Sequence, residues 1–153
     1  MSLIIDANCA SAALSEPTHA DFAPLMRALT EGRAKLVVGG RLRAEYAKLA
    51  PVLRAFRTLN QAGRAVSVPD VEVDNEENAV TANFKLKSDD PHILALARVT
   101  RSRLLCSRDR ALHADFTNPA IINRPRGFVY QDSTHEPLIR KCCNALPPGI
   151  RRT

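Results

Sequence analysis

The sequence is poor in aromatic residues. Tryptophan is absent, and Phe, Trp and Tyr together account for 5% of the 153 residues. Proteins that bind single-stranded nucleic acid without sequence preference commonly stack successive bases on aromatic side chains. The composition gives no evidence of such a base-stacking platform.

Long hydrophobic runs are missing as well. The longest ones, such as residues 3–5 and 104–106, are far shorter than the roughly 18 residues that a membrane span needs. The amino terminus lacks the basic region of a signal peptide and reaches Asp6 early. We therefore expect a cytoplasmic protein that has no membrane partner.

The cysteines do not form a disulfide framework. They include no C-x-x-C pair, and two of them are adjacent in the sequence. Because this spacing is a poor basis for disulfides, we expect reduced thiols. The four residues are Cys9, Cys106, Cys142 and Cys143.

The rest of the composition is that of an ordinary globular protein with an excess of positive charge. Hydrophobic residues make up 45% and charged residues 25% of the chain, close to the globular average. The length predicts a single domain over residues 1–146, followed by a basic, mobile tail at residues 147–153. The 22 Lys and Arg residues against 16 Asp and Glu residues give a net charge of +6, which attracts polyanions without identifying one.

Short apolar runs alternate with longer stretches of helical period, which indicates an α/β fold. The predicted strands are residues 3–5, 36–38, 65–68 and 104–106, with a fifth at either 120–122 or 128–130. Because the first four lack polar alternation, they suit a parallel sheet that is covered on both faces. The predicted helices are residues 21–31, 41–61, 71–84, 90–100, 109–116 and 133–145.

Several residues refine these helices. Asp21 is a plausible cap for the first helix, and Pro51 should kink or split the second. We interpret His92, beside Pro91, as a first-turn surface residue. The acids at the start of the third helix are interpreted as solvated; they are Asp70, Glu72, Asp74, Glu76 and Glu77.

Four other acids fall where a parallel sheet would bring them together. Asp6 directly follows the first strand, and Asp109 follows the fourth. Asp90 begins the helix that leads into the fourth strand, and Glu45 lies near the start of the helix after the second strand. All four positions belong to the carboxyl edge of the sheet, where open α/β folds place their ligands. We therefore expect the four side chains to converge.

The helical position of Glu45 adds to this expectation. Glu45 lies three residues after Leu42 and four before Leu49, which places it on the flank of the buried stripe, where a carboxylate needs a partner. Crowded carboxylates repel one another unless a cation joins them or one is protonated. Their oxygens suit Mg²⁺ or Mn²⁺.

Four segments carry a resemblance to a known family. They are LIIDAN at residues 3–8, RAEY at 43–46, DDPHILALA at 89–97 and LCSRDRAL at 105–112. Together, in this order, they resemble the PIN-domain nucleases, the family that contains the VapC-type toxins. The resemblance extends over about residues 2 to 130.

The resemblance implies a three-layer α/β/α sandwich with a central, mainly parallel sheet of four or five strands, and a metal-dependent ribonuclease activity. The family's acidic positions, which are both catalytic and metal-binding, would be taken by Asp6, Glu45, Asp90 and Asp109. Two polar positions beside the first and last acids would be Asn8 and Ser107.

Two further acids lie close to these motifs. Asp89 competes with Asp90 for the third acidic position; Asp90 is preferred because its spacing to Ile93 matches the family's Asp-x-x-Ile pattern. Asp89 is then the capping neighbour. Asp115 is a candidate fifth acid, although its position also suits a helix surface residue.

The function implied is hydrolysis of RNA phosphodiester bonds with Mg²⁺ or Mn²⁺, in which Arg108 and Arg110 bind the substrate backbone. Five arginines are expected to surround one end of the fourth strand, either as solvated residues or as a phosphate-binding rim; they are Arg98, Arg101, Arg103, Arg108 and Arg110. Two alternatives stay open, a non-catalytic interaction module and a DNA-directed nuclease of the same chemistry. A toxin would have an antitoxin protein as its partner, and a homodimer is a further open partner assignment.

Overall fold

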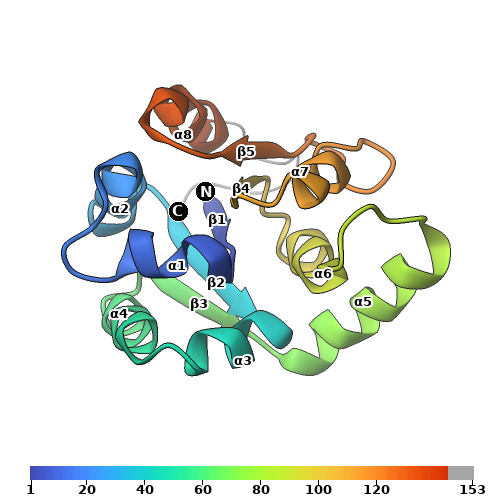
Figure 1. The fold of residues 1–153 in the computed structure, drawn as a ribbon, viewed down its shortest axis with the longest axis horizontal. Helices are drawn as coiled ribbons and strands as arrows, with labels where there is room; N and C mark the ends of the chain where they lie inside the picture. Colours follow the sequence, from blue (N-terminus) through green and yellow to red (C-terminus); the bar gives the residue numbers. More distant parts are fainter. Residues whose placement is uncertain (145–153) are drawn as a thin grey trace.

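The computed structural model describes residues 1–144 of the chain. Within these residues, five parallel strands form one sheet in the order β3-β2-β1-β4-β5 (Figure 1). The strands are β1 (Ser2–Ile5), β2 (Lys35–Gly39), β3 (Ala65–Val68), β4 (Leu104–Cys106) and β5 (Phe128–Tyr130). The predicted tail at residues 147–153 lies outside the described residues.

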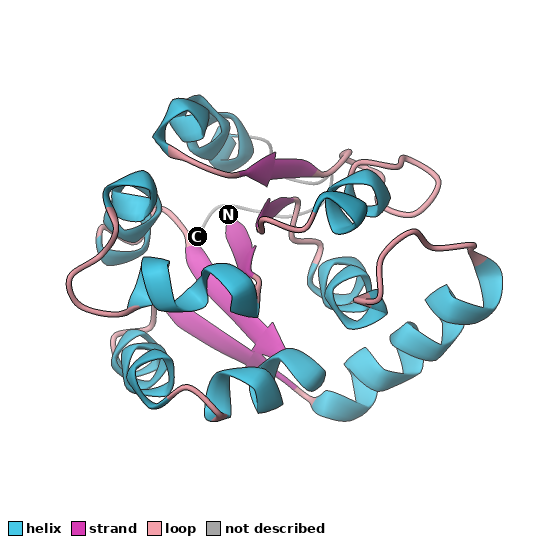
Figure 2. Ribbon diagram, viewed as in Figure 1, coloured by secondary structure: helices cyan, strands magenta, loops and turns pink. Residues whose placement is uncertain are grey.

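Helices cover both faces of this sheet. Figures 1 and 2 show α1, α2 and α4 on one side and α5 and α6 on the other, so the three-layer α/β/α sandwich is confirmed. The α-helices are α1 (Ala7–Leu14), α2 (Ala23–Thr30), α3 (Arg41–Ala47), α4 (Ala50–Gln61), α5 (Asp70–Asn83), α6 (Pro91–Thr100), α7 (Arg110–Phe116) and α8 (Glu136–Asn144). Short 3₁₀ turns at η1 (Ala20–Phe22) and η2 (Ser133–His135) precede α2 and α8.

The first four predicted strands are all present. The apolar runs of β1, β2 and β4 are buried between the helical layers, whereas β3 is an edge strand in which Ala65 is buried and Val66 is exposed. The fifth strand is residues 128–130, and the alternative at 120–122 is wrong. The backbone N–H groups of Ile121 and Ile122 both donate to the carbonyl of Asn118, which closes a local turn instead of pairing with a strand. Both side chains are still buried, so these residues are apolar because they pack in the core and not because they form a strand.

Helix predictions differ from the structure in three places. Helix α1 was not predicted, because its buried positions are mostly small residues that give a weak periodic signal. Asp21 does not cap α2: it lies within η1, where its backbone N–H donates to Nδ1 of His19. The predicted helix at 41–61 splits into α3 and α4 at Lys48 and Leu49, and Pro51 falls in the first turn of α4, where no N–H is needed.

Three of the acids interpreted as solvated on α5 have partners in other elements: Asp70 is exposed, as expected, whereas Glu76 and Glu77 are partly buried. Oδ1 of Asp70 accepts the backbone N–H of Gly40 at 2.9 Å, and Glu77 pairs with Arg41 at 3.1 Å. Glu76 pairs with Arg98 at 2.7 Å. Because α5 packs along α6, and Asp70 and Glu77 reach the start of α3, these acidic side chains meet partners that are distant in the sequence. Across residues 1–144, none of the helices is both long and apolar enough to cross a bilayer.

Candidate functional site

The strand order reverses between β1 and β4, since β2 and β3 lie on one side of β1 and β4 and β5 on the other. Open α/β sheets bind ligands at the carboxyl ends of the strands at such a switch point. Here Ile5 pairs with Cys106, so Asp6 and Ser107 leave the sheet side by side. The Ser107 hydroxyl donates to Oδ2 of Asp6 at 2.9 Å, and the Asp6 side chain is buried.

Ser107 also connects this pair to the fourth acid. Its Oγ accepts the backbone N–H of Asp109 at 3.1 Å and lies 3.5 Å from Nδ2 of Asn8. Oδ1 of Asp109 accepts the backbone N–H groups of Ala111 and Leu112, which caps α7. Asn8 and Ser107 therefore lie beside the first and last acids, as expected from the sequence.

Asp90 occupies the cap position of α6, but its carboxylate makes no capping hydrogen bond. Its pKa is raised by burial first, then by the negative charge of Asp6, and also by a hydrogen bond with Asp109 that stabilises the protonated carboxyl group. The Asp90 carboxylate therefore lies among the other acids and not at the end of its own helix.

The pKa of Asp6 is also raised, chiefly because burial removes water from its carboxylate. The hydrogen bond from Ser107 acts in the opposite direction, and the negative charge of Glu45 raises the pKa further. Asp6 thus interacts electrostatically with Glu45 and with Asp90, and Asp90 interacts with Asp109. The structure places the four predicted acids at one edge of the sheet, where they interact in pairs.

Glu45 has the partner that its half-buried position requires. Nε2 of His92 lies 2.7 Å from Oε1 of Glu45 and, because an ionised carboxylate can only accept, the ring is the donor. The interpretation of His92 as a surface residue is wrong: its side chain is 4% exposed. It lies in the first turn of α6 that faces α3, and its Nδ1 is buried with no hydrogen-bond partner in the part of the chain described.

The two additional acids have different environments. Asp89 is exposed beside Asp90. Asp115 is not a helix surface residue, since its side chain is buried and accepts the backbone N–H groups of Lys87 and Ser88 at 2.9–3.1 Å. Asp115 therefore positions the segment that leads into Asp89 and Asp90, and a carboxylate engaged in this way is an indirect support for the site.

The expectation that five arginines surround one end of β4 is wrong, because they divide between its two ends. Arg108 and Arg110 follow the strand, at the edge that carries the acids, and both are exposed. Arg101 and Arg103 precede it. Arg103 donates to backbone carbonyl groups of Ala97, Asn123 and Pro125, and Arg98 is paired with Glu76, so these two are structural.

The family model of the PIN domain matches this chain over residues 2–111. The chain belongs to the PIN-domain family. This membership supports a nuclease-type function, and PIN domains generally act on nucleic acids with divalent metal ions. All four converging acids lie in the matched range. Neither a curated protein nor a solved structure matches the chain.

The acids of this PIN domain have the donor chemistry of a site for a hard divalent cation. Carboxylates that are buried and repel one another are stabilised when a cation balances their charge. Within residues 1–144, however, no three side chains of His, Cys, Asp or Glu come close enough to form a metal-binding group. The fit therefore rests on the chemistry and the pairwise interactions of the acids.

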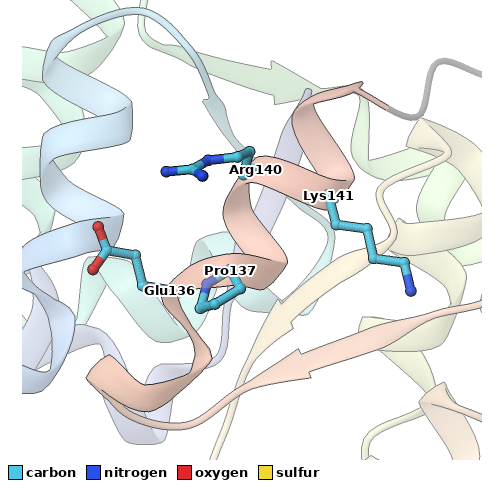
Figure 3. Close-up of a pocket in the computed structure, with 4 residues that line it drawn as sticks. All are labelled: Glu136, Pro137, Arg140 and Lys141. Carbon is cyan, nitrogen blue, oxygen red and sulfur yellow. The ribbon is translucent and has the colours of Figure 1, made fainter.

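A separate cavity lies against α8 and is lined by Glu136, Pro137, Arg140 and Lys141. Figure 3 shows Glu136 and Arg140 projecting to one side of the helix and Lys141 to the other. Glu136 pairs with Arg27 of α2, and Lys141 lies over the ring of Phe128. None of the converging acids borders this cavity, so the candidate site of the PIN domain is the sheet edge.

The raised pKa of Asp6 predicts a gain in stability when its charge is removed. We expect Asp6→Asn to be more stable than the parent at neutral pH in EDTA, because Asn keeps an acceptor for Ser107 without the buried charge. The difference should shrink as the pH falls, since the folded parent binds a proton at a higher pH than the unfolded chain does. Thermal unfolding at several pH values measures this.

The control is Asp74→Asn, which removes an exposed acid of α5. It should leave the melting temperature nearly unchanged at every pH. An Asp6→Asn protein that is less stable than the parent over the whole pH range would contradict the electrostatic account of Asp6.

The buried carboxylate of Asp115 predicts a loss of stability. Asp115→Asn places an amide NH₂ against backbone N–H donors, so we expect a cost of about 1–3 kcal/mol in the free energy of unfolding. Urea denaturation measures it, with the exposed Asp89→Asn as the matched control. Equal, small effects of the two substitutions would mean that Asp115 does not hold the segment at Lys87 and Ser88.

Proposed function

We propose that this PIN domain is a divalent-metal-dependent endoribonuclease that uses Mg²⁺ or Mn²⁺ to hydrolyse RNA phosphodiester bonds. The observation that carries the proposal is the convergence of four carboxylates at the switch between β1 and β4. The ionised forms of Asp6 and Asp90 are destabilised in this arrangement, as their raised pKa values indicate. Such a cost at a sheet edge is typical of a functional site.

Asp6, Asp90 and Asp109 are the proposed direct metal ligands. When bound, the ion would neutralise the scissile phosphate and lower the pKa of a water molecule for in-line attack. Ser107 holds Asp6 through Oδ2, and the cap of α7 holds Asp109 through Oδ1, so both carboxylates are oriented before substrate binds. Asn8 supports Asp6 and Asp109 through its contact with Ser107.

Glu45 is proposed to orient the attacking water or to complete a second metal site. His92 fixes one carboxylate oxygen, Oε1, and so defines the direction in which Oε2 points. Because His92 acts through Glu45, it is a positioning residue. Asp89, which is exposed next to Asp90, supports the third acidic position.

RNA binding is proposed to use Arg108 and Arg110. Both lie at the acidic edge, and Arg108 is held with its guanidinium 5.5 Å from the ring centroid of Phe22. The net charge of +6 favours a polyanionic substrate. We further propose a toxin role within the single domain at residues 1–146, in the cytoplasm, with an antitoxin protein over the site; a homodimer and a DNA substrate are alternatives.

A second candidate function is a non-catalytic interaction module. It is favoured by the lack, among residues 1–144, of three potential ligands close enough to form a metal-binding group. In this function the acidic edge of the sheet would receive basic residues of a partner protein. The two candidates differ in whether any activity depends on metal.

The first experiment tests metal-dependent cleavage. We expect the parent to cut structured or single-stranded RNA with Mg²⁺ or Mn²⁺ and not with EDTA, and Asp6→Asn and Asp90→Asn to lower the rate by orders of magnitude because the ligand set loses charge. Gel electrophoresis of labelled RNA measures the rate, and DNA of the same sequence tests the alternative substrate.

The matched control for these variants is Asp74→Asn, which should cut like the parent. If Asp6→Asn and Asp90→Asn both retain full Mn²⁺-dependent cleavage in a preparation free of contaminating nuclease, the site is assigned to the wrong residues. A parent without any metal-dependent cleavage favours the non-catalytic module.

The second experiment tests the basic edge. Replacing Arg108 and Arg110 with Glu should weaken RNA binding in the Asp6→Asn background and should lower the salt slope by about 1.4 if both arginines contact the phosphates of a single strand. Titrations at several salt concentrations measure the affinity. Arg54 and Arg57 are exposed on α4, so their double reversal is a control with the same change in net charge. Equal losses in the two double variants would mean that only net charge matters.

A further inference from the structure

A groove lies next to the acidic site, between the start of α3, the end of α5 and the segment that leads into α6. Its volume is about 340 Å³, and the lining residues that matter here are Arg41, Phe84, Leu86, Ser88, Asp89 and Pro91. Asp89 and Pro91 flank Asp90 in the sequence, and Arg41 lies one helical turn before Glu45. Residues next to Asp90 in the sequence and one helical turn before Glu45 therefore line the groove.

One wall of the groove is the loop at residues 84–88, which is held in a fixed position. Phe84, Leu86 and Ser88 are partly or fully buried and line the groove, whereas Lys85 and Lys87 between them are exposed. Residues 84–86 have no regular secondary structure and residues 87–89 form bends, so the wall is an irregular loop with alternate side chains on the groove. Because Asp115 accepts the backbone N–H groups of Lys87 and Ser88, the wall is ordered by the protein itself.

The ring of Phe84 is supported by a cation. The guanidinium carbon of Arg98 lies 5.5 Å from the centroid of this ring. Arg98 itself is fixed by Glu76 at 2.7 Å and by the carbonyl oxygen of Ile121 at 2.7 Å. The groove thus contains an aromatic ring whose position is determined by side chains from α5 and α6.

The charges along the groove do not suit a phosphate group. Arg41 is already paired with Glu77, at 3.1 Å, and Asp89 contributes a negative charge. A phosphate would therefore meet no net positive charge. A flat, neutral group with an aromatic face and polar edges fits better, since it can stack on Phe84 and reach the polar side chains of Ser88 and Asp89.

We propose that this groove is a nucleobase subsite, which takes one unpaired base of the nucleotide that flanks the scissile phosphate, with Phe84 as the stacking residue. The proposal rests on the proposed nuclease function, because a base reaches the groove when the backbone crosses the neighbouring acids. A single stacked base is also compatible with the low aromatic content of the chain.

The test measures stacking and not cleavage. The probe is a short single-stranded oligoribonucleotide with 2-aminopurine placed at each position in turn, bound to the Asp6→Asn protein, with a DNA oligonucleotide of the same sequence in parallel. We expect fluorescence quenching at one position. Phe84→Leu should abolish this quenching and weaken binding roughly tenfold, the order expected for the loss of one base–aromatic stack.

Two variants separate stacking from structure. Phe84→Tyr keeps the aromatic face and should retain the quenching and the affinity. Phe128→Leu, on strand β5, is the matched control. Phe128 is also partly buried, and the Lys141 ammonium nitrogen lies 4.5 Å from the centroid of its ring. It should bind like the parent, and thermal unfolding should show that all three variants are folded.

Unchanged quenching and affinity in folded Phe84→Leu would overturn the subsite, as would equal losses in Phe84→Leu and Phe84→Tyr, or a parent that does not bind the probe. The proposed function fails separately. If the parent does not cleave RNA but quenching still depends on Phe84, the subsite stands and hydrolysis does not. If cleavage depends on metal while Phe84→Leu changes neither KM nor quenching, only the subsite is wrong.

Discussion

Strand β1 pairs in parallel with β4 through three pairs of residues whose side chains are all fully buried: Leu3 with Leu104, Ile4 with Leu105 and Ile5 with Cys106. A shift of this register by one residue would pair Ser2 or Asp6 with β4 in place of a fully buried apolar residue, so the pairing is specified by burial. The same register decides that Asp6 and Ser107 leave the sheet together. The strand order reverses between β1 and β4. Helix α6, which leads into β4, and helix α7, which follows it, both begin at this edge, with Asp90 and Asp109 in their cap positions. The hydrophobic core thus determines where the charge of this PIN domain is concentrated.

The four carboxylates differ in how many hydrogen bonds they accept from their neighbours. Asp109 accepts two backbone N–H groups, and Glu45 accepts a bond from His92. Asp6 accepts one bond from Ser107, yet burial still raises its pKa. Asp90 makes no capping bond, and both burial and the charge of Asp6 raise its pKa. Such groups lower the stability of the folded state, and a positive charge placed among them would reduce this cost.

Much of the fold and the position of the acids could be predicted from the sequence, because both follow from the order of the apolar runs. Strands whose residues are buried, such as β1 and β4, have apolar residues at consecutive positions, which predicts them from the sequence. The parallel topology then places the acids that follow them. Helix α1 gave a weak signal, since Ala10 and Ala13 bury as fully as leucines but contribute little hydrophobicity. The role of His92 depends on a contact with Glu45, which is 47 residues away in the sequence, so no local pattern contains it. The same is true of Asp115 and its bonds to Lys87 and Ser88.

Asp115, which is buried, and Arg98, which is partly buried, are charges held by hydrogen bonds to other parts of the fold. Asp115 holds the segment before Asp90, and Arg98 joins α5 to α6 through Glu76 and supports the ring of Phe84. Neither residue lies among the converging acids, but both determine the shape of the surface next to them. The hydrogen bonds of Asp115 and Arg98 stabilise the folded state. Burial of the Asp6 and Asp90 carboxylates destabilises it. The first kind of charge therefore builds a rigid frame, and the second kind leaves within that frame a concentrated negative potential that a cation can balance.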